Sequence, residues 1–185
     1  MKKILIFAAM ALVSAAAFAQ PKFAHVNFQE LYQLMPEADQ ARATMTATQN
    51  EAMDTYQTMI EEYQSKVTQY QQKASTWTQT VRESKERELT DMQQRIAEFE
   101  QNIQQELAAQ QNELMAPLVQ KAQEAVSSLA KAGSYIYVFD TSQMLYIDPA
   151  QSTDLTPAAR KALNIPEGRT LETLQAELQA AAQGL

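Results

Sequence analysis

The stretch from Glu37 to about Lys131 limits most strongly what this chain can fold into. It contains no Gly and a single Pro, Pro117, and it is rich in Gln, Glu and Ala. Its apolar residues recur at alternating steps of three and four, which is the spacing of a coiled-coil seam. They form a first series, Met53, Tyr56, Ile60, Tyr63, Val67, Tyr70, Ala74 and Trp77, and a second series, Leu89, Met92, Ile96, Phe99 and Ile103. The spacing predicts two long helices and a mainly α-helical protein.

The two series mirror each other about the bond between residues 79 and 80. The mirrored pairs are Tyr70 and Leu89, Val67 and Met92, Tyr63 and Ile96, Ile60 and Phe99, and Tyr56 and Ile103. A break in the heptad repeat also falls at mirrored places, between Ala52 and Tyr56 and between Ile103 and Leu107. Two paired helices accommodate such a break only where both change phase at the same level. The symmetry therefore predicts one long antiparallel helical hairpin.

The start of the chain has the pattern of a secretory signal peptide. Lys2 and Lys3 precede an apolar run, and small residues surround Phe18 at the end of Met1–Ala19. We therefore expect export, with cleavage after Ala19. The alternative is a membrane anchor, but the run is short for a bilayer span. No later segment is apolar enough to cross a membrane, so stable membrane insertion is not expected, and the absence of Cys excludes disulfides and thiolate chemistry.

The exported chain is expected to be acidic. The full sequence has 15 Lys and Arg residues and 22 Asp and Glu residues, so loss of Lys2 and Lys3 leaves 13 basic against 22 acidic residues, a net charge of −9. An acidic surface repels phosphate backbones. Nucleic acid is therefore excluded as the expected partner.

Short β-forming runs on either side of the hairpin predict a small β body. The predicted segments are residues 20–36 with a first strand and a short helix, 37–132 with the hairpin and its turn near 76–82, 133–164 with two strands and a short helix, and 165–185 with a C-terminal helical extension. Tyr135–Phe139 and Met144–Asp148 are rich in β-branched and aromatic residues and predict a strand hairpin. Three short strands with open edges are unstable alone, so we expect partner subunits to cover them.

Local signals mark where the helices bend, end and begin. Pro117 predicts a bend in the returning helix rather than its end, because the apolar periodicity resumes after it. Gly133 is expected to cap the end of this helix. Thr156 is predicted to be the N-cap of a short helix with Pro157 at its first position, and Thr170 is predicted to cap the last helix.

Nothing in the sequence indicates a catalytic, cofactor or metal site. The chain has three Gly and no phosphate-binding loop, and its one His, His25, lies in the first predicted strand, where a structural role is favoured. Glu61 with Glu62, and Glu98 with Glu100, do not face a common point on a helix, so they predict a solvated face. No carboxylate-rich segment has the spacing of a calcium loop. We predict a binding protein that is not an enzyme and needs no cofactor or metal.

The apolar stripe of the hairpin is the candidate binding surface. Such a stripe is more often a helix–helix seam, yet two helices alone leave the flanks of Tyr, Met and Phe side chains in contact with water. Adaptable Met and amphipathic Tyr along such an edge suit weak contacts with many apolar partners. The candidate residues for binding such partners are Met45, Met53, Tyr56, Met59, Tyr63, Tyr70, Trp77, Met92 and Phe99.

Three segments, taken in their order and spacing, resemble one known family. The segments are KFAHVNFQELYQLMPE at Lys22–Glu37, LTDMQQRIAEFEQNIQQELAAQQNELMAPLVQKAQEAV at Leu89–Val126, and YIYVFDTSQMLYIDPAQSTDLTPAARKAL at Tyr135–Leu163. Together they resemble the Skp, or OmpH-like, family of periplasmic chaperones for outer membrane proteins. The resemblance covers residues 22–163.

The resemblance implies an assembly and an activity. It implies a jellyfish-like homotrimer, in which strands of three protomers join in a trimerisation body and three helical hairpins project as coiled-coil tentacles around a cavity. It also implies an ATP-independent periplasmic holdase that binds unfolded outer membrane β-barrel proteins and prevents their aggregation. The residues that fall where this body is assembled are Phe23, Val26, Phe28, Leu31, Tyr137, Phe139, Leu145 and Ile147.

The charge of the hairpin departs from the family. The best-known member is strongly basic, whereas Glu37 to Lys131 holds 15 acidic and 9 basic residues here. Lipopolysaccharide contact, which the basic tentacles of that member support, is therefore not carried over to this chain. The alternative to a holdase is a structural coiled-coil spacer or adaptor in the cell envelope, which needs the same periodicity but no client.

Overall fold

The computed structural model describes residues 21–183. The signal peptide predicted for Met1–Ala19 lies outside these described residues. The chain divides into two compact units: a sheet unit, which combines the segment ending at Pro36 with the segment beginning at Val119, and a hairpin unit, Glu37–Leu118. The fold is mainly helical with one small sheet, as the sequence predicts.

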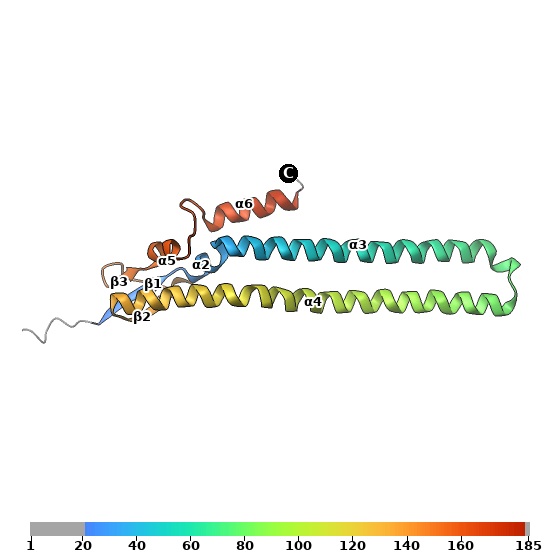
Figure 1. The fold of residues 1–185 in the computed structure, drawn as a ribbon, viewed down its shortest axis with the longest axis horizontal. Coiled ribbons are helices and arrows are strands. Elements are labelled where there is room, and N and C mark those ends of the chain that lie inside the picture. The colour runs from blue at the N-terminus through green and yellow to red at the C-terminus, as the bar shows by residue number, and fades with distance from the viewer. Residues whose placement is uncertain (1–20, 184–185) are drawn as a thin grey trace, which may run out of the picture. The chain divides into compact units, whose positions relative to one another are not determined.

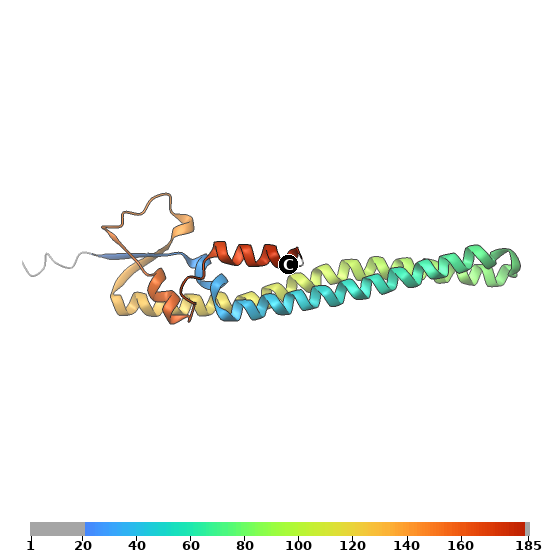
Figure 2. The same ribbon diagram turned by 90° about the horizontal axis from the view of Figure 1, so that it is seen from above.

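The hairpin unit is built from two helices that lie side by side in both Figure 1 and Figure 2. Helix α3 spans Pro36–Lys73, and helix α4 spans Gln79–Gly133. An ion pair between Lys66 of α3 and Glu88 of α4 joins residues that are close to the turn on both helices. The two helices are therefore antiparallel neighbours within this unit.

The turn between the two helices begins earlier than the sequence predicts. A short 3-10 helix, η2 (Ala74–Thr76), follows α3, and Trp77 then takes an extended backbone with ψ 152°. The Trp77 ring packs edge-on against Tyr70, with 5.9 Å between the ring centroids. Trp77 therefore leaves the helical seam and covers the last turn of α3. The reversal occupies residues 74–78, so it overlaps only the start of the predicted range of 76–82.

The seam between α3 and α4 contains most of the two predicted apolar series, but not Trp77, and Met53 is 68% exposed. Met92 and Ile96 of α4 are buried, with 7% and 9% of their surface exposed. The other seam residues of the hairpin unit are half-buried, and they are Tyr56, Ile60, Tyr63, Val67, Tyr70, Leu89, Phe99 and Ile103. Two helices thus bury the centre of the stripe and leave its edges in water.

Helix α4 continues through Pro117 to Gly133, as the resumed periodicity predicts. The prediction that Gly133 supplies the left-handed cap is wrong, because the residue with positive φ, 56°, is Ser134. Gly133 instead leaves space for a neighbouring ring. A Cβ atom at this position would lie 2.2 Å from Cε2 of Tyr135, so a larger residue would displace the Tyr135 ring from the end of the helix.

The sheet has three strands in the order β2-β1-β3. Strand β1 is Lys22–Val26, β2 is Tyr135–Asp140 and β3 is Ser152–Asp154. Both outer strands run parallel to β1. Strands β2 and β3 therefore form the two open edges of this sheet within the described chain.

The predicted strand hairpin of Tyr135–Phe139 and Met144–Asp148 is wrong. Met144–Asp148 is not a strand. The Asp140 carboxylate accepts a hydrogen bond from the Ser142 amide at 3.1 Å and starts another short 3-10 helix, η3 (Thr141–Gln143). A tight strand hairpin needs Gly, Asn or Asp at positive φ in its turn, and this segment does not adopt that conformation.

Strand β3 takes the third place in the sheet although its sequence, Ser-Thr-Asp, has low strand propensity. Its pairing is fixed by two contacts with His25 of β1. The His25 Nδ1 atom lies 2.9 Å from the Ser152 hydroxyl, and the Leu155 amide donates to the His25 carbonyl at 2.9 Å. These tertiary contacts override propensity, and they give His25 a structural role.

Three short helices complete the sheet unit: α2 (Phe28–Leu34), α5 (Thr156–Ala162) and α6 (Leu171–Ala182). Helix α2 contacts both α5 and α6. The buried apolar residues of this unit are Ala24, Val26, Leu31, Leu34, Met35, Ala122, Leu155, Ala159, Leu163, Ile165 and Leu174. The unit therefore has a small core of its own, centred on α2.

The two predicted helix caps differ in outcome. Thr156 is not the N-cap of α5, because Leu155 holds that position. The Thr156 hydroxyl instead accepts a hydrogen bond from the Asn27 amide at 3.0 Å, which connects α5 to the start of α2. Thr170 caps α6 as predicted, in a capping box with Thr173.

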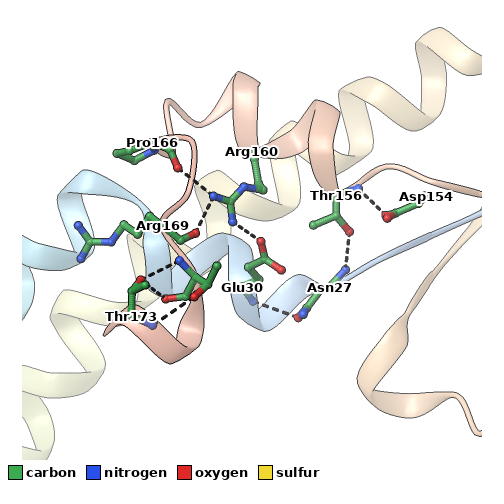
Figure 3. A network of polar contacts seen from close by, with 9 residues as sticks. Asn27, Glu30, Asp154, Thr156, Arg160, Pro166, Arg169 and Thr173 are labelled. Carbon is green, nitrogen blue, oxygen red and sulfur yellow. Dashed lines mark hydrogen bonds and ion pairs between the residues drawn. The ribbon is translucent and has the colours of Figure 1, made fainter. Parts of the chain in front are cut away.

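Arg160 of α5 connects the C-terminal linker to α2, as Figure 3 shows. Its guanidinium pairs with Glu30 and donates to the carbonyls of Pro166, at 2.9 Å, and Arg169, at 2.7 Å. Leu174 of α6, which is 5% exposed, packs in the same unit. One side chain thus satisfies two linker carbonyls and one carboxylate.

Replacing Arg160 with Ala is expected to release the C-terminal helix. The variant leaves Glu30 without its cation and two linker carbonyls without a donor, which costs on the order of 2 kcal/mol of local stability. Hydrogen exchange of the amides in Leu171–Ala182 should become faster, while exchange in α3 should not change. Lys161→Ala, on the exposed neighbouring residue, is the control. Equal exchange in both variants would contradict the role of Arg160.

Candidate functional site

A groove lies between α3 and α4 in the hairpin unit, at the level of the mirrored breaks in the heptad repeat. Its volume is about 610 Å³. It is lined by Gln49, Ala52, Met53 and Tyr56 of α3 and by Phe99, Glu100, Ile103, Gln104 and Leu107 of α4. A break in the repeat interrupts regular knobs-into-holes packing. The small side chain of Ala52 at this level leaves the space between the helices unfilled.

The walls of this groove are mainly apolar and can be reached from water. Met53 is 68% exposed. Tyr56, Phe99, Ile103 and Leu107 are half-buried, so each presents part of its side chain to solvent. A flexible thioether beside aromatic rings adapts to apolar side chains of different shapes. The groove therefore suits weak binding of extended apolar segments.

Three tyrosines of α3 fix the register of the hairpin by bonding across it. Their partners on α4 are Glu100 for Tyr56, Gln93 for Tyr63 and Glu86 for Tyr70. Both sets recur every seven residues, so the same contact repeats along the seam. The carboxylates of Glu100 and Glu86 accept these hydrogen bonds and thereby raise the pKa of Tyr56 and of Tyr70 above the usual value.

A cluster of charges closes the seam near the turn. The Glu88 carboxylate accepts hydrogen bonds from Lys66 across the hairpin and from Lys85 on its own helix, the latter at 2.7 Å. Glu62 lies 3.7 Å from Lys66. The two lysine ammonium groups hold the pKa of Glu88 at about 2.

The low pKa of Glu88 predicts a loss of hairpin stability in acid. Its pKa in the folded state lies below the ordinary value of 4.5, so Glu88 stabilises the hairpin above about pH 4.5 and loses this effect as the pH falls toward about 2. An NMR titration of the Glu88 carboxyl should give a midpoint near 2, and Lys66→Met should raise it. Lys73→Met, on the exposed end of α3, is the control. A midpoint near 4.5 in the unsubstituted protein would contradict the cluster.

The sheet unit exposes a second apolar surface. Phe23 stacks on Tyr137, with 6.3 Å between ring centroids and 6° between planes, and Phe139 lies 6.0 Å from Tyr137. Ile136 and Tyr137 of the edge strand β2 are nevertheless 54% and 60% exposed, and Leu145 after η3 is fully exposed. We call Ile136, Tyr137 and Leu145 the edge patch.

An open apolar cleft of about 480 Å³ lies in the same unit. It is lined by Val26, Phe28, Val119, Gln123, Val126, Ser127, Ala130, Val138 and Asp140. Its walls come from β1, α2, β2 and the part of α4 between Val119 and Ala130. The cleft and the edge patch are therefore two solvent-accessible apolar surfaces of the sheet unit.

The sequence matches the model of the family described as outer membrane protein (OmpH-like) over residues 22–163. The chain belongs to the OmpH-like family. This match confirms the resemblance found in the sequence. Helix α6 lies beyond the matched residues. None of the curated proteins matches the sequence.

Solved structures of similar fold include one with a matching family description. It is the crystal structure of an OmpH-like protein from Caulobacter crescentus CB15, assigned as an outer membrane chaperone. The two chains are 15% identical, with a TM-score of 0.70, and the similarity covers 79% of this chain and 85% of the other. At this level of identity the similarity shows a shared fold.

The structure distributes the predicted client-binding residues of the OmpH-like chain over different surroundings. Met53, Tyr56 and Phe99 line the groove. Met92 is buried in the seam. The other predicted residues are half-buried, namely Met45, Met59, Tyr63, Tyr70 and Trp77. The groove is therefore where the predicted residues come together most closely.

Sequence reasoning missed the groove as a site, although the signal was present. Ile103, Leu107 and Ala52 mark the two heptad breaks, and all three line the groove. The polar partners of the tyrosines were also missed. The matching seven-residue spacing of Glu86, Gln93 and Glu100 would have identified them.

The predicted body residues of the OmpH-like chain fall into three groups. Val26 and Leu31 are buried in the core of the single chain, whereas Tyr137 and Leu145 belong to the exposed edge patch. The remaining members are half-buried, namely Phe23, Phe28, Phe139 and Ile147. The exposed residues, Tyr137 and Leu145, are available for contact with other molecules.

Metal-binding clusters and membrane-spanning helices are both absent from the described residues. Within residues 21–183, no group of three or more His, Cys, Asp or Glu side chains is arranged to hold a metal ion. Among the helices of the same residues, none has both the length and the apolar character needed to cross a bilayer.

Proposed function

We propose that this OmpH-like protein is an ATP-independent periplasmic holdase, which binds unfolded outer membrane β-barrel proteins and prevents their aggregation. The observation that carries the proposal is the solvent-accessible apolar groove of the hairpin, with Met53 exposed at its wall. Unfolded barrel strands carry alternating apolar residues that aggregate in water. A groove lined by Met, Tyr and Phe shields such residues without selecting one sequence.

The proposed assembly is a homotrimer in which the hairpins act as tentacles around a shared cavity. The exposed edge patch and the open edge of β2 support this assembly, because a neighbouring protomer would cover both. Each groove binds weakly, and several grooves acting on one client provide avidity. Release needs no nucleotide, since folding of the client into the membrane buries its apolar face.

Light scattering tests the holdase directly. A urea-unfolded outer membrane β-barrel protein is diluted into buffer without nucleotide, with and without this protein. We expect scattering to fall to near the level of buffer when the assembled protein is present in slight excess. Unchanged scattering would contradict the holdase. If the protein then bound one folded envelope protein, it would be a structural spacer or adaptor instead.

The groove is tested with Met53→Ser. Loss of one partly exposed thioether should weaken client binding roughly fivefold, because part of its apolar contact area is removed. The matched control is Leu178→Ser, which removes an apolar side chain that is 48% exposed on α6. Equal client affinity in the two variants, measured by fluorescence anisotropy of a labelled client, would place the client elsewhere.

A further inference from the structure

We propose that the groove selects cationic apolar segments, in which Lys or Arg alternates with aromatic or branched apolar residues. This inference rests on the proposed holdase function and names the class of client segment that its groove prefers. It is carried by the distribution of charge along the two helices that form the groove.

The middle of the hairpin is a band of negative charge. Residues 43–65 of α3 contain Glu51, Asp54, Glu61 and Glu62 and no Lys or Arg. Residues 96–118 of α4 contain Glu98, Glu100, Glu106 and Glu113 and likewise no Lys or Arg. The two stretches lie against each other, because the groove is lined by residues 49–56 of one and 99–107 of the other. The groove therefore lies inside a band of eight carboxylates without a cation.

The basic residues of the hairpin unit lie beyond this band on both sides. Arg42 precedes it on α3, and Lys66 and Lys85 pair with Glu88 near the turn. Lys66 also lies 3.7 Å from Glu62, so it offsets the charge of the band at its turn end only. An anionic segment entering the groove would be repelled along the band, whereas a cationic one would be attracted.

The chemistry of the groove suits the long side chains of Lys and Arg. Glu100 lines it and presents a carboxylate beside Tyr56. The methylene stems of Lys and Arg pack on apolar walls, and their charged ends favour aromatic faces and carboxylates. Phe99 and Tyr56 supply rings, and Asp54 follows Met53 directly on α3. A segment with cations beside apolar residues satisfies both parts of the surface.

The same charge argues against occupants from this chain. A second hairpin would bring another acidic band against the first. Helix α6 is apolar on one side but carries Glu172 and Glu177 and no Lys or Arg. Charge complementarity therefore points to a separate, cationic client segment.

Two labelled peptides test the proposal on the intact protein. Both have the same alternating Tyr, Val and Phe residues, and the polar positions are Lys in one and Glu in the other. Fluorescence anisotropy at low salt should show that the Lys peptide binds at least about tenfold more tightly, and the difference should shrink as salt is added. Equal affinity for the two peptides would overturn the proposal.

Charge variants show whether the band causes the preference. Asp54→Asn combined with Glu100→Gln should reduce the preference to about threefold, because the pair removes the carboxylate that lines the groove and the carboxylate that follows Met53 in sequence. The matched control removes two exposed carboxylates outside the hairpin unit, Glu167→Gln combined with Glu172→Gln, and should leave it unchanged. A preference that survives the first pair, or falls equally in the control, would also overturn the proposal.

Light scattering on the same preparations separates the two claims. If the protein suppresses client aggregation but binds both peptides equally, or neither, the charge preference fails and the holdase stands. If scattering is unchanged and neither peptide binds, both the holdase and the preference fail.

Discussion

Replacing Ile96 with Asp is expected to unfold the helical hairpin. Ile96 is 9% exposed at the centre of the seam, so the substitution removes a buried apolar side chain and places a carboxylate there. Together these effects cost about 3–5 kcal/mol. Because two helices have only one narrow seam between them, a loss of this size removes most of the stability of the hairpin.

The measurement for this variant is hydrogen exchange in α3 together with helical circular dichroism. Fast exchange along α3 and a large loss of helical signal are expected. Ala97→Asp is the matched control, since Ala97 is the next residue of the same helix and is exposed. Native exchange rates in the Ile96 variant would contradict the seam, and so would equal losses in the two variants.

Replacing Leu145 with Lys is expected to break the proposed homotrimer without unfolding the protomer. Leu145 is fully exposed in the single chain, so Lys there removes no contact within it. In the proposed assembly the same side chain is covered, and burying an unpaired ammonium costs several kcal/mol at each of three equivalent positions. The equilibrium should therefore shift almost completely to monomers.

Sedimentation velocity measures this change, with circular dichroism as the check on folding. The control is Gln143→Lys, which adds the same charge to an exposed residue of η3 that lies two positions away. We expect a folded monomer for Leu145→Lys and an unchanged assembly for Gln143→Lys. A trimer that persists in the first variant would remove Leu145 from the interface.

The hairpin could be predicted from the sequence because the same apolar pattern recurs along both helices. Apolar residues recur at every turn of both helices, and the breaks at Ala52 and Ile103 fall at matching levels, so each position supports the others. The position of the turn was predicted less accurately. Trp77 continues the apolar spacing, but its ring packs on Tyr70 outside the seam. Periodicity alone cannot distinguish a seam residue from a ring that folds back.

The sheet was harder to predict because propensity and pairing disagree in it. Met144–Asp148 has the composition of a strand but pairs with nothing in the described chain, whereas Ser152–Asp154 has poor propensity and pairs through His25. A contact between residues 127 positions apart cannot be recognised from the local sequence pattern around either residue. In the proposed trimer, the apolar character of Met144–Asp148 reflects contact with a neighbour.

The sequence predicted some residues of the candidate site but not the groove that they line. Met53, Tyr56 and Phe99 were found by their chemistry, because exposed Met and aromatic residues are unusual on a solvated helix. The groove itself depends on what a heptad break does to packing at the level of Ala52, which requires both helices in register. The acidic band was visible as composition, but only the antiparallel pairing places its two halves together.

Native mass spectrometry of the protein mixed with an unfolded outer membrane β-barrel client tests the central claim most directly. The account predicts a complex of three copies of this chain with one client, formed without nucleotide. Free protein of any oligomeric state beside a precipitated client would contradict it.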